Sequence, residues 1–144
     1  SQTIGAGAQR LSETFFARVH RALAADFGPA FPIESLNAAV SGTNARASFG
    51  AYRRTYLRFK PDLVVINFSI NGDLEELRFG LGKHLRINRA EGIATILVKE
   101  AVLPRAGRKR LGQRHRIVAA TARQYGAEVY DLDAEPGPAV ALRA

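Results

Sequence analysis

Three short loops contain the residue types in this sequence that could do chemistry. Each loop is rich in small and polar residues, and each stands before a segment with helical periodicity: residues 1–8, 41–44 and 69–73. Serine hydroxyls, glycine backbone amides and an asparagine side chain at one sheet edge would suit ester or acyl transfer. In that chemistry a hydroxyl attacks a carbonyl, and negative charge builds on the carbonyl oxygen.

The elements that must position these loops alternate between helix and strand. Apolar residues at helical spacing predict helices over residues 11–27, 49–59, 74–85 and 111–125. Apolar and β-branched stretches predict strands over residues 33–40, 62–70, 93–98 and 128–132. Strands that alternate with helices are joined by crossovers, so we expect an α/β fold with a parallel sheet and helices on both faces. The loops that follow the strands would then lie along one edge of the sheet.

The composition is that of one globular domain. The chain has 144 residues, of which 47% are hydrophobic and 24% charged, and this is enough to bury a core. It has no cysteine, which excludes a disulfide framework, a thiolate nucleophile and a cysteine-ligated metal. No apolar run approaches the roughly 20 residues of a membrane-spanning helix. The composition does not assign the protein to a cellular compartment.

The ends of the chain bear on how much of the domain the sequence includes. Residue 1 belongs to a loop with no strand before it, whereas the first strand of a doubly wound sheet normally lies in its middle. We therefore expect a single domain over residues 1–144 that is incomplete at both ends.

The three loops resemble the separated sequence blocks of the SGNH hydrolases, also called the GDSL lipase/esterase family. The first block of that family is Gly-Asp-Ser followed by small residues, and the sequence from Ser1 onward matches it from its serine. The second block has a glycine in the loop after the next strand, which Gly42 matches. The third block is Gly-x-Asn-Asp after a strand that begins Pro-Asp-Leu-Val-Val, and here residues 61–65 lead to Asn71.

This resemblance implies a fold, an activity and a set of site residues. The implied fold is a flavodoxin-like, three-layer α/β/α arrangement. The implied activity is serine-dependent hydrolysis of an acyl or acetyl ester of a small molecule, carbohydrate or lipid. Ser1 would be the nucleophile, and Gly42 and Asn71 would contribute to the oxyanion hole. No cofactor or metal is implied.

Two features depart from the family pattern. In the third block Ser69 replaces the usual glycine, and Gly72 is inserted before the acid. The family's final block, Asp-x-x-His, supplies the general base and the acid that orients it, and no histidine follows Asp131. The resemblance therefore runs over about residues 1–132 and leaves the base unidentified, so the chain as given should be nearly inactive.

Other functions remain as alternatives. The strongest is a non-catalytic α/β binding module that has kept the fold and lost the base. A dinucleotide-binding loop is disfavoured because Gly5 and Gly7 are followed by Arg10 where a third glycine is needed. The three histidines are expected on helices, without the spacing of metal ligands. They are His20, His84 and His115.

A basic segment makes nucleic-acid binding a third alternative. The chain has a net charge of +8, and much of the excess is concentrated within residues 105–116. Several basic side chains together can contact phosphates, but no aromatic residues are interleaved with them to stack on bases. A solvated loop and first helical turn is the favoured interpretation, so we do not expect a nucleic-acid partner. The segment contains Arg105, Arg108, Lys109, Arg110, Arg114 and Arg116.

Overall fold

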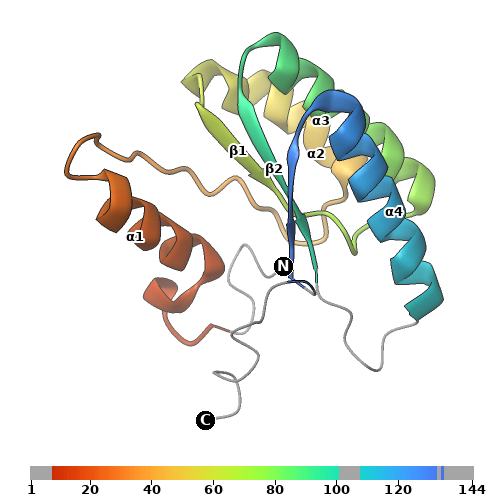
Figure 1. Ribbon diagram of the computed structural model, residues 1–144, viewed down its shortest axis with the longest axis horizontal. Helices are drawn as coiled ribbons and strands as arrows, with labels where there is room; N and C mark the ends of the chain where they lie inside the picture. The colour runs from red at the N-terminus through yellow and green to blue at the C-terminus, as the bar shows by residue number, and fades with distance from the viewer. Residues whose placement is uncertain (1–7, 101–107, 133, 135–144) are drawn as a thin grey trace. The chain divides into compact units, whose positions relative to one another are not determined.

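The computed structural model describes residues 8–100, 108–132 and 134, and of residues 108–110 the backbone alone (Figure 1). The chain forms two compact units, which we call unit 1 (residues 1–42) and unit 2 (residues 43–144). The expected single domain over the whole chain therefore stays a prediction.

Unit 1 contains one helix and a long extended segment. A short 3₁₀ turn, Leu11–Glu13, precedes helix α1, Phe15–Phe27. The Thr14 hydroxyl caps α1 by accepting a hydrogen bond from the backbone N–H of Ala17 at 3.2 Å. The predicted helix over residues 11–27 is thus confirmed. The predicted strand over residues 33–40 is wrong, because this segment forms no ladder with another strand and apolar residues alone cannot supply a backbone partner.

The second predicted helix is longer and less regular than its sequence pattern. It begins as α2, Ala45–Ala51, and continues through a π-helical turn, Tyr52–Tyr56, and a 3₁₀ turn, Leu57–Phe59. It ends before Pro61, as predicted. The Tyr52 hydroxyl is buried and donates to Oδ1 of Asn88 at 2.5 Å.

Three parallel strands form the sheet of unit 2. They are β1, Leu63–Ile66, β2, Ala94–Lys99, and β3, Glu128–Asp131, in the order β1-β2-β3. Both pairs of neighbours are parallel, so the predicted parallel sheet is confirmed. β1 is shorter than predicted, because the chain turns after it: the backbone N–H of Asn71 donates to the carbonyl of Phe68 at 3.2 Å.

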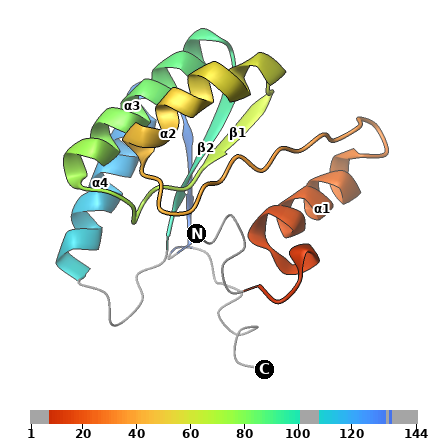
Figure 2. The same ribbon diagram turned by 180° about the vertical axis from the view of Figure 1, so that it is seen from behind.

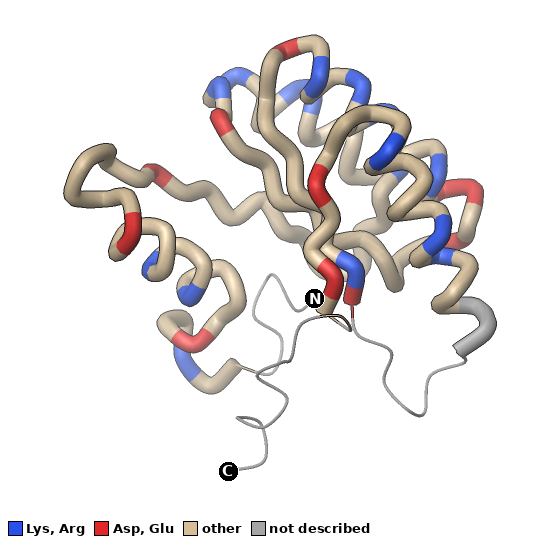
Figure 3. Tube along the Cα trace, viewed as in Figure 1, with Lys and Arg blue, Asp and Glu red and all other residues tan. Residues whose placement is uncertain are grey.

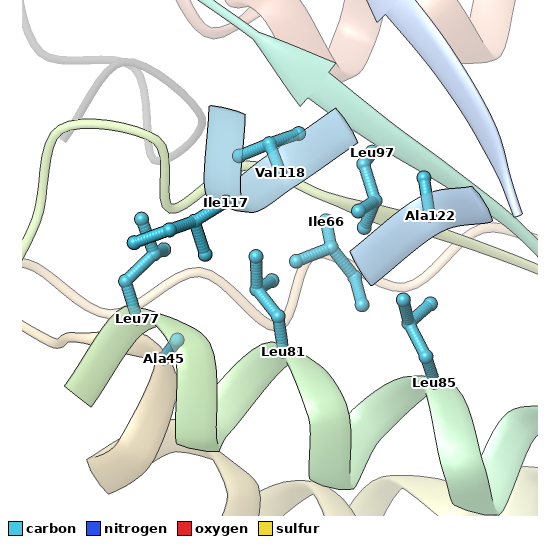
Figure 4. Close-up of a cluster of buried hydrophobic side chains, with 9 residues drawn as sticks. All are labelled: Ala45, Ile66, Leu77, Leu81, Leu85, Leu97, Ile117, Val118 and Ala122. Carbon is cyan, nitrogen blue, oxygen red and sulfur yellow. The ribbon is translucent and has the colours of Figure 1, made fainter. Parts of the chain in front are cut away.

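Two crossover helices connect these strands and pack side by side. Helix α3, Leu74–Ala90, leads from β1 to β2, and helix α4, Arg108–Tyr125, precedes β3 (Figures 1 and 2). Both contact β2 and each other. Their facing apolar stripes form the core with residues from α2 and the sheet, as Figure 4 shows. The core residues are Ala45, Ile66, Leu77, Leu81, Leu85, Leu97, Ile117, Val118 and Ala122.

A close contact joins α2 to α3. Gly80 of α3 is buried, and a Cβ built on it would lie 2.2 Å from the carbonyl carbon of Ala45. Ala45 itself has no exposed surface. Because only a residue without a side chain fits there, Gly80 lets the first turn of α2 lie directly on α3. The start of α2 is fixed in this way.

Charged residues are numerous along the helices of unit 2 and the turns between them. Lysine and arginine are spread along α2, α3 and α4, as well as through the turns after α2 (Figure 3). Glu75 and Glu76 lie in the first turn of α3, where a negative charge complements the helix dipole. In the part of the chain that the structure describes, no helix combines the length and the apolar character needed to cross a membrane.

Candidate active site

The three residues predicted for the site fall in different parts of the chain. Ser1 lies outside the described residues. Gly42 is the last residue of unit 1, with a φ of +71°, and Asn71 belongs to unit 2. Asn71 is the one of the three that lies in the unit containing the sheet, so the candidate site is centred on Asn71. We call residues 69–73 the Asn71 loop.

The Asn71 side chain has a fixed orientation. The Asn71 loop follows β1 at its carboxyl end and leads into α3, which is where an open α/β sheet places its ligands. Nδ2 of Asn71 donates to the backbone carbonyl of Thr43 at 2.9 Å. Only the nitrogen of a side-chain amide can donate, so this bond decides which way the amide points. The nitrogen has two hydrogens, so one is left for a second acceptor.

The inserted glycine, Gly72, allows the acid after it to cap α3. Asp73 and Glu76 form a capping box, in which Oδ1 of Asp73 accepts from the N–H of Glu76 at 2.7 Å. Gly72 has a φ of +73°, and a Cβ built on it would lie 2.8 Å from the Cβ of Asn44. Asn44 is the N-cap of α2. The departure from Gly-x-Asn-Asp thus has a structural reason: the loop passes closely over the start of α2 before α3 begins.

The other departure, Ser69, ties the loop to β2. Ser69 is 1% exposed, and its hydroxyl accepts a hydrogen bond from the backbone N–H of Glu100 at 3.2 Å. Glu100 comes directly after β2 and is itself buried. Burial raises the pKa of the Glu100 carboxyl, and a hydrogen bond with the Asn67 side chain opposes that rise.

A third contact with the Asn71 loop comes from α4. The Arg114 side chain is 5% exposed and donates through Nη1 to the carbonyl of Asn71 at 3.1 Å. Its Nη2 donates to the carbonyl of Gly72. The interpretation of residues 105–116 as a solvated segment is therefore wrong for Arg114. It holds for Arg116, which is exposed, whereas Arg105 and the side chains of residues 108–110 lie outside the described part.

The spacing of Arg114 along the sequence indicates a buried position, although its charge suggests an exposed one. It lies three residues after Leu111 and four before Val118, which are both buried, so helical spacing places it on the buried face of α4. Burial of a charged side chain on an apolar stripe is costly unless polar groups nearby form hydrogen bonds or ion pairs with it. Here the partners include two loop carbonyls, those of Asn71 and Gly72, which come from a different part of the chain.

His84 has a structural role. Its Nδ1 lies 2.8 Å from the carbonyl of Gly80, and its Nε2 lies 3.3 Å from the Ser48 hydroxyl. The rings of Phe49 and Tyr52 pack against it. Burial lowers the pKa of His84, which keeps the imidazole neutral between α2 and α3. Within residues 8–100, 108–132 and 134, no group of three histidines and acids could hold a metal ion.

Two surface grooves of unit 2 are not lined by residues of the Asn71 loop. A groove of about 290 Å³ runs between α3 and α4 and is lined by Arg78, Lys83 and Tyr125 among others. A second groove of about 260 Å³ lies beside Gly92 and Gly126, before β2 and β3. Neither groove is lined by Asn71.

Comparison with known proteins supports the fold. No family model and no curated protein matches the sequence. Among solved structures, the chain is similar to AlinE4, an SGNH-hydrolase family esterase, with a TM-score of 0.72 and 18% identity over 99% of this chain and 75% of that chain. A variant of esterase AlinE4 with a serine changed to alanine gives a TM-score of 0.72 at 20% identity, over 99% and 74% of the two chains. A variant with an aspartate changed to alanine gives 0.72 at 18% identity, over 99% and 75%.

The likeness establishes the class of fold. The chain has the α/β fold of an SGNH-hydrolase family esterase. The predicted α/β fold and, as regards the fold, the resemblance to that family are therefore confirmed.

Proposed function

We propose that this protein is a serine-dependent hydrolase of acyl or acetyl esters. In this proposal Ser1 is the nucleophile, and the Gly42 backbone amide and the Asn71 side-chain amide form part of the oxyanion hole. The fold of an SGNH-hydrolase family esterase supports the class of reaction. The observation that carries the site is the Asn71 amide, held by the Thr43 carbonyl at the carboxyl end of β1 with one hydrogen left to donate.

The reaction would proceed through a tetrahedral intermediate. The Ser1 hydroxyl attacks the ester carbonyl and loses its proton to a general base, and the carbonyl oxygen becomes negatively charged. The amides of Gly42 and Asn71 donate to that oxygen, and each such donor typically stabilises the transition state by about 3–4 kcal/mol. Because the Asn71 amide is already oriented, it needs no rearrangement as the charge develops.

A non-catalytic α/β binding module is the second candidate. It is favoured by the placement of the histidines in the described part of the chain. All three lie on helices and none belongs to the Asn71 loop: His20, His84 and His115. Such a module would bind an ester or a related ligand at the same sheet edge without turning it over. Ligand protection against thermal unfolding would reveal it.

The test begins with the coding sequence on both sides of residues 1–144 and an assay of the longest natural form on short p-nitrophenyl esters. Ser1→Ala should abolish turnover while the fold is retained. Asn71→Ala should lower kcat by about 100- to 1,000-fold, because one oxyanion donor is lost. Gln124→Ala, which removes an exposed amide from α4, is the matched control and should leave kcat unchanged.

The outcomes separate the two candidates. Turnover that survives Ser1→Ala overturns the assignment of the nucleophile. No turnover by the longest natural form, together with a raised melting temperature in the presence of a non-hydrolysable ester analogue, supports the binding module instead.

A further inference from the structure

We propose that Arg114 is a positioning residue that holds the Asn71 loop in the conformation in which Asn71 can donate to an oxyanion. This inference rests on the proposed function and names a residue that neither the sequence motifs nor the fold comparisons identify. Arg114 does not act on substrate. It acts through the backbone of Asn71.

The geometry of the contact carries the inference. The guanidinium of Arg114 donates to two successive carbonyls, those of Asn71 and Gly72, through two different nitrogens. A planar fork that binds two neighbouring carbonyls restricts the peptide that joins them. That peptide begins at the Cα of Asn71, so fixing it also fixes the direction in which the Asn71 side chain leaves the backbone.

The two carbonyls lie outside the hydrogen-bond ladder of the helix that follows them. Both carbonyls precede α3, whose own ladder begins with the carbonyl of Asp73 accepting from Leu77. Arg114 supplies donors to both of these carbonyls from α4. The Thr43 carbonyl orients the far end of the Asn71 side chain, while Arg114 fixes the near end.

Three variants of the longest natural form test the proposal kinetically. Arg114→Met keeps much of the apolar stem but has no donors, and it should lower kcat by about 10- to 100-fold with KM changed less than about twofold, because misplacing a group by about 1 Å costs on that order. Arg114→Lys retains one charged donor and should recover part of that loss. Arg116→Met removes the same charge from an exposed position on α4 and should behave as the wild type.

Hydrogen exchange read by mass spectrometry supplies the second measurement. Arg114→Met should speed exchange of the amides of residues 69–76, while residues 117–125 of α4 stay as protected as in the wild type. A general loosening of α4 would instead show a packing role and would overturn the proposal. If Arg114→Met does not fold, Arg114→Lys carries both measurements, with a smaller expected effect in each.

The two readouts keep this proposal apart from the proposed function. If the wild-type protein has no turnover, the proposed function fails, and faster exchange confined to residues 69–76 still supports the hold of Arg114 on the loop. If the wild type is active, unchanged kcat in Arg114→Met overturns the positioning role while the proposed function stands.

Discussion

Gly42 and Gly72 have almost the same backbone conformation in very different surroundings. Their φ angles are +71° and +73°, in the left-handed region that favours glycine. A Cβ built on Gly42 meets nothing within 4 Å, whereas one built on Gly72 meets the Cβ of Asn44 at 2.8 Å and Oε2 of Glu76 at 2.7 Å. A glycine in a turn can therefore be required by the backbone conformation alone, or by the backbone conformation and close packing together. Only at Gly72 do the neighbours fix the loop.

The largest effect should come from Gly80→Ala, which tests the packing of α2 on α3. The N-cap of α2, Asn44, lies against Gly72. A Cβ at Gly80 would lie 2.2 Å from the carbonyl carbon and 2.5 Å from the carbonyl oxygen of Ala45, both of them backbone atoms. We expect a loss of about 3 kcal/mol or more in the free energy of unfolding, at the upper end of overpacking costs. Urea unfolding measures it.

Gly82→Ala is the control for that experiment. It changes the same residue type in the same helix, and its Cβ would meet only the Tyr125 hydroxyl at an ordinary 3.8 Å. The substitution should raise stability by roughly 0.5–1 kcal/mol, as alanine does in a helix interior. Equal effects of the two substitutions would contradict the close contact of α2 with α3.

Gly72→Ala and Gly42→Ala test whether the packing around Gly72 contributes to stability. Both substitutions put alanine into a left-handed conformation, which costs roughly 1–2 kcal/mol. At Gly72 the overlap with Asn44 should add about 1–3 kcal/mol, so this variant should be the less stable of the two in thermal or urea unfolding. Identical losses at both positions would show that packing around Gly72 contributes nothing.

Ser69→Ala tests the tie between the Asn71 loop and β2. It leaves the buried N–H of Glu100 without its acceptor, and we expect a cost of about 1–2 kcal/mol in the free energy of unfolding. Ser12→Ala changes an exposed serine of unit 1 and should cost less than about 0.5 kcal/mol. A loss that is no greater at position 69 would remove this tie from the description of the site.

The smallest effect concerns the Glu100 carboxyl and depends on pH. Burial raises the pKa of this carboxyl in the folded protein above the ordinary value of 4.5. Between the unfolded and the folded pKa, the folded chain binds more protons than the unfolded chain, so the free energy of unfolding falls as pH rises. Glu100→Gln removes this titration and should therefore stabilise the protein more at about pH 7 than at about pH 4. Thermal unfolding at both pH values checks the sign, and parallel curves for the two proteins would contradict it.

Local patterns predicted much of unit 2. The repeat of Leu77, Leu81 and Leu85 predicted the buried face of α3, because helical spacing brings residues three and four apart onto one stripe. The alternation of such stripes with β-branched runs predicted the parallel sheet. These features depend on neighbours in the sequence, so they can be read from it.

Two predictions failed because the deciding partners were distant in the sequence. Residues 33–40 have the composition of a strand, but a strand also needs the backbone of another segment, and none pairs with them here. Arg114 has the charge of a surface residue, but it is buried and donates hydrogen bonds to two loop carbonyls from about forty positions earlier in the chain. Composition contains no information about either partner.

The candidate site divides in the same way. Residue types at short spacing were enough to predict the order of the elements in unit 2, the loop that carries Asn71 and the resemblance of three blocks to one family. Packing brought together the Thr43 carbonyl and the Asn71 amide, Gly72 and Asn44, and the Arg114 guanidinium and the Asn71 loop. Each of those contacts joins segments that become neighbours only when α2, α3 and α4 pack together.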